Sequence, residues 1–221
     1  MKPYYEHDGS TIYHGDCREI LPTLEPVDLV LTDPPYGIGA NKMTLGSGKH
    51  SFHRGASWDD EAPVEIIKTL PNLAGECCVW GGNYFAHSFP EVNSWLVWHK
   101  MNDGRSFSEA EMAWTNYAPQ LRVFSKYAAR RLKQHPTEKP IEIMRWSLSF
   151  SKTAGTILDP FMGSGTTLRA AKDLNRNAIG IEIEERYCEI AAKRLAQGVL
   201  QFDVPKSSGH SQVELPGFTN L

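Results

Sequence analysis

One stretch of the sequence has the pattern of a buried strand, a glycine turn and the start of a helix: Thr156-Ile157-Leu158-Asp159-Pro160-Phe161-Met162-Gly163-Ser164-Gly165-Thr166. Leu168, Ala171 and Leu174 continue it at helical spacing, and residues 177–182 supply one more apolar strand. A G-x-G turn after a strand is a weak signal alone, because many folds contain one and the third glycine of the dinucleotide-binding fingerprint is missing. Its late position in the chain is more informative.

In a doubly wound nucleotide-binding fold this glycine turn normally follows the first strand, whereas here only one clear strand comes after it. The other strands must therefore come from residues 10–117, where apolar runs alternate with helical patterns. Such runs predict a mostly parallel sheet covered on both faces. The sequence thus predicts an α/β, doubly wound, Rossmann-like sheet in circularly permuted order. Residues 111–117 alternate in polarity and predict an antiparallel edge strand.

A second rigid turn, Thr32-Asp33-Pro34-Pro35-Tyr36-Gly37, follows the apolar run of residues 27–31. Its two prolines fix two φ angles and remove two N–H donors. Asp33 and Tyr36 are thereby expected at the carboxyl end of a strand, where ligands bind in open α/β sheets. In the permuted order the strands ending at Asp33 and Asp159 lie side by side, so both turns would face one crevice. The alternative is a plain strand-ending turn in which Asp33 bonds only nearby backbone.

The chain of 221 residues is long enough for one large domain, expected over residues 1–201. Residues 37–60 predict a mobile loop on the substrate side of the domain, because so long a loop is usually functional or mobile. Residues 202–221 lack periodicity and predict a loosely ordered tail. The net charge of −3 gives no global basic signal, so nucleic-acid binding would depend on local patches.

The four cysteines form no C-x-x-C pair, which favours neither a zinc site nor a disulfide framework and fits a reducing, cytoplasmic setting. His50 and His53 have no third ligand nearby, so no metal is expected. No apolar run approaches membrane-spanning length, and no membrane partner is expected.

Three motifs, in their order along the chain, resemble the beta group of DNA amino-methyltransferases. They are D-P-P-Y at residues 33–36, H-P-T-E-K-P at residues 135–140 and D-P-F-M-G-S-G-T at residues 159–166. The resemblance covers roughly residues 10–197. Members of this group transfer a methyl group from S-adenosylmethionine to an exocyclic nitrogen of a DNA base. The resemblance therefore implies S-adenosyl-L-methionine as cofactor, double-stranded DNA as partner and a target base flipped out of the duplex.

The resemblance implies catalytic roles for Asp33, Pro34, Pro35 and Tyr36. Asp33 and the carbonyl of Pro34 would accept hydrogen bonds from the target amine, and the prolines would hold that carbonyl rigid. Tyr36 would stack on the flipped base. The attacking nitrogen gains positive charge, which Asp33 would stabilise. No cysteine follows a proline as in the cytosine-C5 methylases, so no covalent enzyme intermediate is expected.

The resemblance also implies a set of cofactor-binding residues: Asp16, Asp33, Thr137, Lys139, Asp159, Phe161, Gly163, Ser164, Gly165, Thr166 and Glu182. Gly163 and Gly165 would let the backbone approach the methionyl part of the cofactor. Asp159 would meet its amino group, and the following helix N-terminus would meet its carboxylate.

The remaining cofactor assignments each have a structural alternative. Glu182 would bind the ribose hydroxyls, or be a solvated carboxylate. Asp16 would lie near the adenine, and Asp16 and Asp159 could instead cap the helices that follow them. Thr137 and Lys139 would close over the methionine end, although Lys139 could be an ordinary surface charge. Phe161 is expected to form a pocket wall.

Two acid-free stretches of the sequence are candidates for contact with DNA phosphates. Their basic residues are Lys42, Lys49, Arg54, Arg122, Lys126, Arg130, Arg131 and Lys133. Members of the family often carry a long target-recognition insert, whereas here only residues 118–134 are available. The sequence thus predicts a short form with a minimal target-recognition segment, and the alternative is a plain exposed basic face.

The type of target base follows from the first residue of the D-P-P-Y motif. Enzymes acting on the N4 amine of cytosine more often carry serine there, so Asp33 favours the N6 amine of adenine. The alternatives are an N4-cytosine methyltransferase and a non-catalytic subunit of the same fold that binds cofactor or DNA. A homodimer is left open.

Overall fold

The computed structural model describes residues 2–37, 62–102, 108–127 and 138–198, and structural statements below concern these residues. They form one sheet with the strand order β1-β2-β9-β8-β3-β4-β6-β5-β7. The strands are β1 (Tyr5–His7), β2 (Ser10–His14), β3 (Leu29–Thr32), β4 (Glu76–Trp80), β5 (Trp95–His99), β6 (Ala110–Thr115), β7 (Arg122–Ser125), β8 (Ile157–Asp159) and β9 (Ala178–Glu182).

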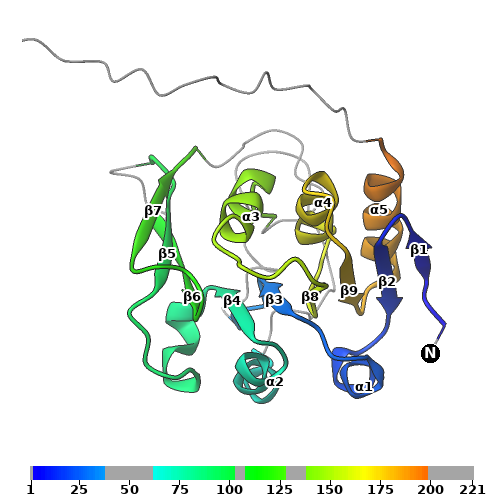
Figure 1. Ribbon diagram of the computed structural model, residues 1–221, viewed down its shortest axis with the longest axis horizontal. Helices are drawn as coiled ribbons and strands as arrows, with labels where there is room; N and C mark the ends of the chain where they lie inside the picture. The colour runs from blue at the N-terminus through cyan, green and yellow to red at the C-terminus, as the bar shows by residue number, and fades with distance from the viewer. Residues whose placement is uncertain (1, 38–61, 103–107, 128–137, 199–221) are drawn as a thin grey trace, which may run out of the picture.

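Helices cover both faces of the sheet. The helices α3 (Ile141–Leu148), α4 (Thr166–Asp173) and α5 (Glu185–Ala196) lie on one face, and α1 (Cys17–Ile20) and α2 (Val64–Thr69) lie on the other (Figure 1). Short 3-10 turns, η1 (Leu21–Thr23), η3 (Leu70–Asn72) and η4 (Gly82–Ser88), complete the described part. The predicted α/β class with a sheet covered on both faces is therefore confirmed.

The strand directions confirm the permuted order. Strands β2, β9, β8, β3 and β4 pair in parallel with their neighbours. Strand β8 and its glycine turn come late in the chain, yet β8 lies in the middle of the sheet and pairs directly with β3. The two turns after Thr32 and Asp159 therefore leave the sheet at the same edge.

The outer strands differ from the sequence-based expectation. Strand β6 is antiparallel, as expected for residues 111–117, but it lies between β4 and β5 and is not an edge strand. The edge strands are β1, antiparallel to β2, and β7, parallel to β5. Neither was expected, because β1 has three residues and β7 is mostly exposed, so neither shows an apolar run.

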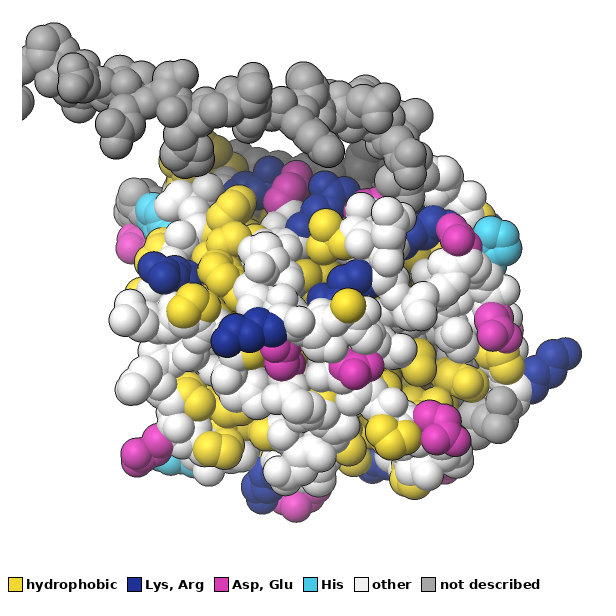
Figure 2. Space-filling model, in the orientation of Figure 1, with side chains coloured by type: hydrophobic (Ala, Val, Ile, Leu, Met, Phe, Trp, Pro, Cys, Tyr) yellow, Lys and Arg dark blue, Asp and Glu magenta, His cyan; other side chains and the backbone are white. Residues whose placement is uncertain are grey.

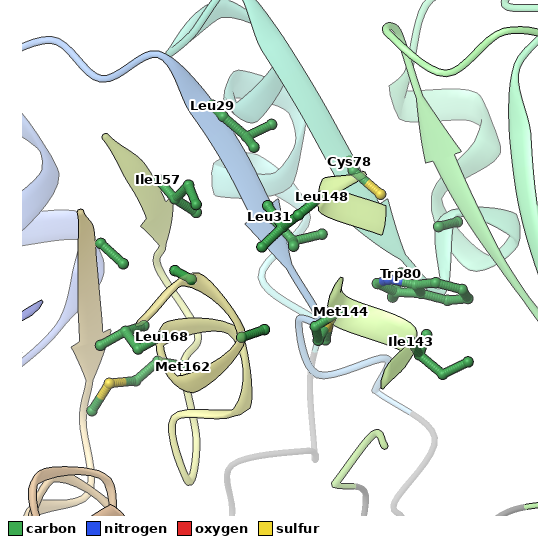
Figure 3. Packing of buried hydrophobic residues seen from close by; sticks show 14 of the residues in the cluster. Leu29, Leu31, Cys78, Trp80, Ile143, Met144, Leu148, Ile157, Met162 and Leu168 are labelled. Atoms are coloured by element: carbon green, nitrogen blue, oxygen red, sulfur yellow. The ribbon is translucent and has the colours of Figure 1, made fainter. Parts of the chain in front are cut away.

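Apolar residues on both faces of β3 hold the centre of the fold together. On the face of α3 and α4, Leu29 and Leu31 pack with Leu148, Met144 and Leu168, all at most 3% exposed (Figure 3). Val30 belongs to the cluster on the other face. Leu174 was expected on the buried face of α4, but it follows the last residue of that helix and is 43% exposed. None of the helices in the described ranges is long and apolar enough to span a membrane.

Candidate active site

The turn after β8 places a buried carboxylate beside β3. The hydroxyl of Thr32 donates to Oδ1 of Asp159 over 2.6 Å, and the backbone N–H of Phe161 donates to the same oxygen over 3.1 Å. Burial raises the pKa of Asp159 to about 6, although these donors oppose the shift. The alternative that Asp159 caps α4 is wrong, because the residue at the N-cap is Gly165.

The glycine turn itself requires glycine. Gly163 and Gly165 have φ angles of 50° and 78°, in the left-handed region that side chains disfavour. A Cβ at Gly165 would also lie 2.8 Å from Cβ of Ala191 in α5. No side chain caps the N-terminus of α4. The first N–H groups of this helix therefore face the turn without a side-chain partner at the cap.

Glu182, at the end of β9, is tied to the same turn. Its Oε2 accepts a hydrogen bond from the N–H of Gly163 over 2.9 Å, and its Oε1 accepts one from the N–H of Glu184 over 2.8 Å. Burial raises the pKa of Glu182 to about 7. The reading of Glu182 as a simply solvated carboxylate does not fit these contacts.

Asp16 lies one strand further along, after β2. The N–H of Gly15 donates to the backbone oxygen of Glu182 over 2.9 Å, which places Asp16 next to the end of β9. Oδ1 of Asp16 caps α1 by accepting the N–H of Arg18 over 2.8 Å. An ion pair with the Arg18 side chain lowers the pKa of Asp16. The capping alternative for Asp16 is thus correct, and its position beside Glu182 leaves the cofactor role as a proposal.

The D-P-P-Y turn after β3 meets a buried lysine. The hydroxyl of Tyr36 donates to Oδ1 of Asp33 over 2.5 Å, and Nζ of Lys139 lies 2.5 Å from the same oxygen and 3.0 Å from the Tyr36 hydroxyl. The Lys139 side chain is only 3% exposed, so the alternative of an ordinary surface charge is wrong. A plain strand-ending turn is also excluded, because Asp33 pairs with the side chain of Lys139, from a distant part of the chain.

A second carboxylate that the sequence reasoning missed shares this lysine. Oε2 of Glu111 in β6 lies 3.0 Å from Nζ of Lys139, and Oε1 lies 2.7 Å from Nζ of Lys100. Burial disfavours charge on both Glu111 and Lys139. The attraction of Lys139 to Asp33 and Glu111, and that of Glu111 to Lys139 and Lys100, is stronger than this effect. The pKa of Glu111 falls to about 2, and that of Lys139 rises well above its ordinary value. Burial raises the pKa of Asp33, and Lys139 opposes that shift.

The ring of Tyr36 is held between aromatic and glycine neighbours. It stacks on Tyr84 with a centroid distance of 4.7 Å and an interplanar angle of 19°. Gly81, in the left-handed conformation, lies against the Tyr36 ring. Tyr84 is 51% exposed, so this stacked pair lies at the surface of the site.

One cavity joins the two turns. It brings together predicted residues from three parts of the chain: Asp33, Lys139, Asp159, Phe161, Gly163, Ser164 and Thr166. Phe161 is half-buried and forms part of the wall, as expected. The cavity is also lined by Glu138, Met144, Met162 and Thr167, which were missed. Glu138 and Met162 belong to two of the motifs but were given no role, and Met144 and Thr167 lie in helices α3 and α4 without a distinguishing pattern.

Few of the residues expected to contact DNA fall in the described ranges. Arg122 is exposed on β7, and Lys126 forms an ion pair of 3.1 Å with Glu142 of α3. Lys42, Lys49 and Arg54 lie outside the described residues, as do Arg130, Arg131, Lys133 and Thr137. Basic and acidic side chains are interspersed on the face shown in Figure 2. The described residues contain no group of three His, Cys, Asp or Glu side chains that could hold a metal.

Relatives of this chain are known. A type II methyltransferase from Lactococcus lactis subsp. cremoris, M2.LlaDCHI, is 28% identical over 89% of this chain and 93% of its own. The crystal structure of the M1.HpyAVI-SAM complex is 26% identical and has a TM-score of 0.61 over 85% of this chain and all of that chain. The cytosine-N4-specific PvuII DNA methyltransferase shares the fold, with a TM-score of 0.63 over 90% of this chain and 91% of that chain at 16% identity.

The family match covers more than half of the chain. Residues 79–193 match the N6/N4-type family described as DNA methylase, a range that includes Glu111, Lys139 and the glycine turn. Asp33 lies before this range and is brought to it by the pairing of β3 with β8. The fold, the shared cavity and this match agree, and the chain belongs to the N6/N4 DNA methylase family.

Proposed function

We propose that this protein transfers a methyl group from S-adenosyl-L-methionine to the N6 amine of an adenine in double-stranded DNA. The observation that carries the proposal is that Asp33 of the D-P-P-Y turn and the glycine turn after β8 line the same cavity. The D-P-P-Y turn is suited to an amine and the glycine turn to a cofactor. These two turns follow β3 and β8, which are adjacent in the sheet.

The residues around the glycine turn fit the cofactor by their chemistry. Gly163 and Gly165 leave the backbone open to close approach, and the uncapped N-terminus of α4 favours a carboxylate. Asp159 offers a carboxylate to the amino group, and Glu182 offers one to the ribose hydroxyls. S-adenosylmethionine, when bound, supplies an electrophilic methyl group on a positively charged sulfur. The solved M1.HpyAVI relative holds this compound, which supports the same assignment here.

The residues of the D-P-P-Y turn act on the target amine. Asp33 and the carbonyl of Pro34 accept hydrogen bonds from the amine and orient its lone pair, and Pro35 keeps that carbonyl in place. As the nitrogen gains positive charge, the carboxylate of Asp33 stabilises it. Tyr36 stacks on the flipped base. Asp16, Phe161, Ser164, Thr166 and Thr137 complete the proposed cofactor site.

The choice of adenine rests on Asp33 in place of serine. The fold alone does not separate the two amines, because a cytosine-N4-specific enzyme shares it. The proposed DNA contacts are the basic residues of the 37–60 loop and of the 118–134 segment. The free cysteines Cys17, Cys77, Cys78 and Cys188 are all buried, which is compatible with the proposed reducing, cytoplasmic setting.

The proposal is tested by incubating the protein with labelled S-adenosylmethionine and DNA and digesting the product to nucleosides. The expected product is N6-methyladenine, whereas N4-methylcytosine would move the assignment to the other amine. Cofactor binding without labelled DNA would identify a non-catalytic subunit. Asp33→Ala is expected to abolish transfer and to leave cofactor affinity nearly unchanged. Loss of both to the same degree would contradict the division of the cavity into two halves.

A further inference from the structure

Glu111 is the one acidic side chain of β6, and it reaches the catalytic turn through a lysine. Nζ of Lys139 lies 2.5 Å from Oδ1 of Asp33 and 3.0 Å from Oε2 of Glu111. Two carboxylates, one from the turn after β3 and one from β6, thus share one ammonium group. Lys100 binds the other oxygen of Glu111 at 2.7 Å, so the cluster contains two carboxylates and two ammonium groups.

We propose that Glu111 is a positioning residue that holds the ammonium group of Lys139 while Asp33 accepts the target amine. This inference rests on the proposed function and extends it to a residue outside the D-P-P-Y motif. Glu111 contacts neither the base nor the cofactor in this proposal and acts only through Lys139.

The reason is that the target amine must compete with other groups for the carboxylate of Asp33. Its Oδ1 already receives the Tyr36 hydroxyl and the Lys139 ammonium. A cation on this oxygen weakens it as an acceptor for an amine that becomes positively charged. Glu111 offers the same cation a second carboxylate at 3.0 Å, compared with 2.5 Å for Asp33, so Lys139 can shift towards Glu111 without losing a charge partner. Because the Lys139 side chain is almost fully buried, leaving it unpaired would be costly.

The test is the rate of a single turnover with saturating S-adenosylmethionine and DNA, together with the Kd for the cofactor. Glu111→Gln keeps the shape of the side chain and removes its charge. We expect the rate to fall by about tenfold or more, with cofactor affinity changed by less than about twofold. Glu111→Asp keeps the charge and is expected to retain most of the rate. Glu65→Gln, an exposed carboxylate paired with Lys68 on α2, is the matched control and should behave as the wild type.

A double variant separates positioning from a general loss of structure. If Glu111 acts through Lys139, then Glu111→Gln should change the rate by less than about twofold in a Lys139→Met background. A loss of the same size in both backgrounds would overturn the inference, and so would a wild-type rate for Glu111→Gln. Both outcomes leave the proposed function intact if the wild type methylates DNA. A wild type that transfers no methyl group to DNA would instead refute the proposed function.

Discussion

Gly81 offers a direct test of the position of Tyr36. It has a φ of 69°, and a Cβ built on it would lie closest to Cε1 of the Tyr36 ring, 2.5 Å from Cζ and 2.8 Å from Cδ1. Carbon atoms in contact prefer a separation of about 3.5–4.0 Å. In Gly81→Ala the Tyr36 ring must therefore move away by about 1 Å, or the backbone must leave the left-handed conformation. Either change disturbs the 2.5 Å hydrogen bond from Tyr36 to Asp33.

The expected cost has two parts. A left-handed alanine costs about 1–2 kcal/mol, and weakening the partly buried hydrogen bond costs about 1 kcal/mol more. Gly81→Ala should thus lower the free energy of unfolding by about 2–3 kcal/mol. A displacement of about 1 Å in a residue that positions the substrate reduces the rate on the order of 100-fold. Cofactor affinity should change little, because Tyr36 belongs to the proposed amine-binding turn and does not line the cavity that contains the glycine turn.

Urea unfolding and single-turnover methyl transfer measure these two effects. Gly75→Ala is the matched control, since a Cβ there meets no atom within 4 Å, and it should leave both stability and rate nearly unchanged. A Gly81→Ala variant with wild-type transfer rate would refute the role of the Tyr36 position. A variant that loses cofactor binding as much as transfer would also do so.

Three further predictions concern the rest of the site. Thr32→Val removes a hydrogen-bond donor from Asp159, so it should raise the pKa of that carboxyl above about 6. The same change should lower the free energy of unfolding by about 1–3 kcal/mol, as measured by urea unfolding. An unchanged urea midpoint would contradict this prediction. Glu182 has a pKa raised from 4.5 to about 7, so its contribution to stability is fully present below pH 4.5 and is lost as the pH rises to about 7. Between pH 5 and pH 8 the free energy of unfolding of the wild type should therefore fall by about 2 kcal/mol relative to that of Glu182→Gln. A difference between the two proteins that stays constant over this pH range would exclude the raised pKa of Glu182. The double variant Arg130→Ala, Arg131→Ala should bind DNA more weakly. Its plot of log binding constant against log salt concentration should be flatter by about one unit of slope per lost phosphate contact. Fluorescence anisotropy at several salt concentrations measures both effects.

The sequence predicted the centre of the fold better than its edges. The pairing of β3 with β8 followed from the late glycine turn, because only one strand could come after it. Strong apolar runs and rigid turns carry this kind of information. Strands β1 and β7 were missed because they are short and largely exposed, and their place depends on the neighbouring strand rather than on their own residues.

The charged cluster at Asp33 could not have been predicted from spacing. Lys139 and Glu111 come from a turn and from a strand that are far apart in the sequence, and neither has a pattern that marks it as buried. Charged residues are mostly exposed, so the ordinary expectation for both is a surface position. Only the tertiary contacts of the segment before α3 bring Lys139 together with Asp33 after β3 and Glu111 in β6.

Two acids lie at neighbouring strand ends, Asp33 after β3 and Asp159 at the end of β8, and their partners make them different. Asp159 is 2% exposed, and the side chain of Asp33 is 17% exposed. Asp159 receives hydrogen bonds from neutral groups, the Thr32 hydroxyl and the Phe161 N–H, and burial moves its pKa to about 6. Asp33 instead faces the ammonium group of Lys139, which opposes the effect of burial. Paired acids whose environments differ in this way can perform different tasks within one site. In the proposed function the target amine meets the carboxylate that has Lys139 as its partner, so the position of Lys139 should affect transfer more than cofactor binding.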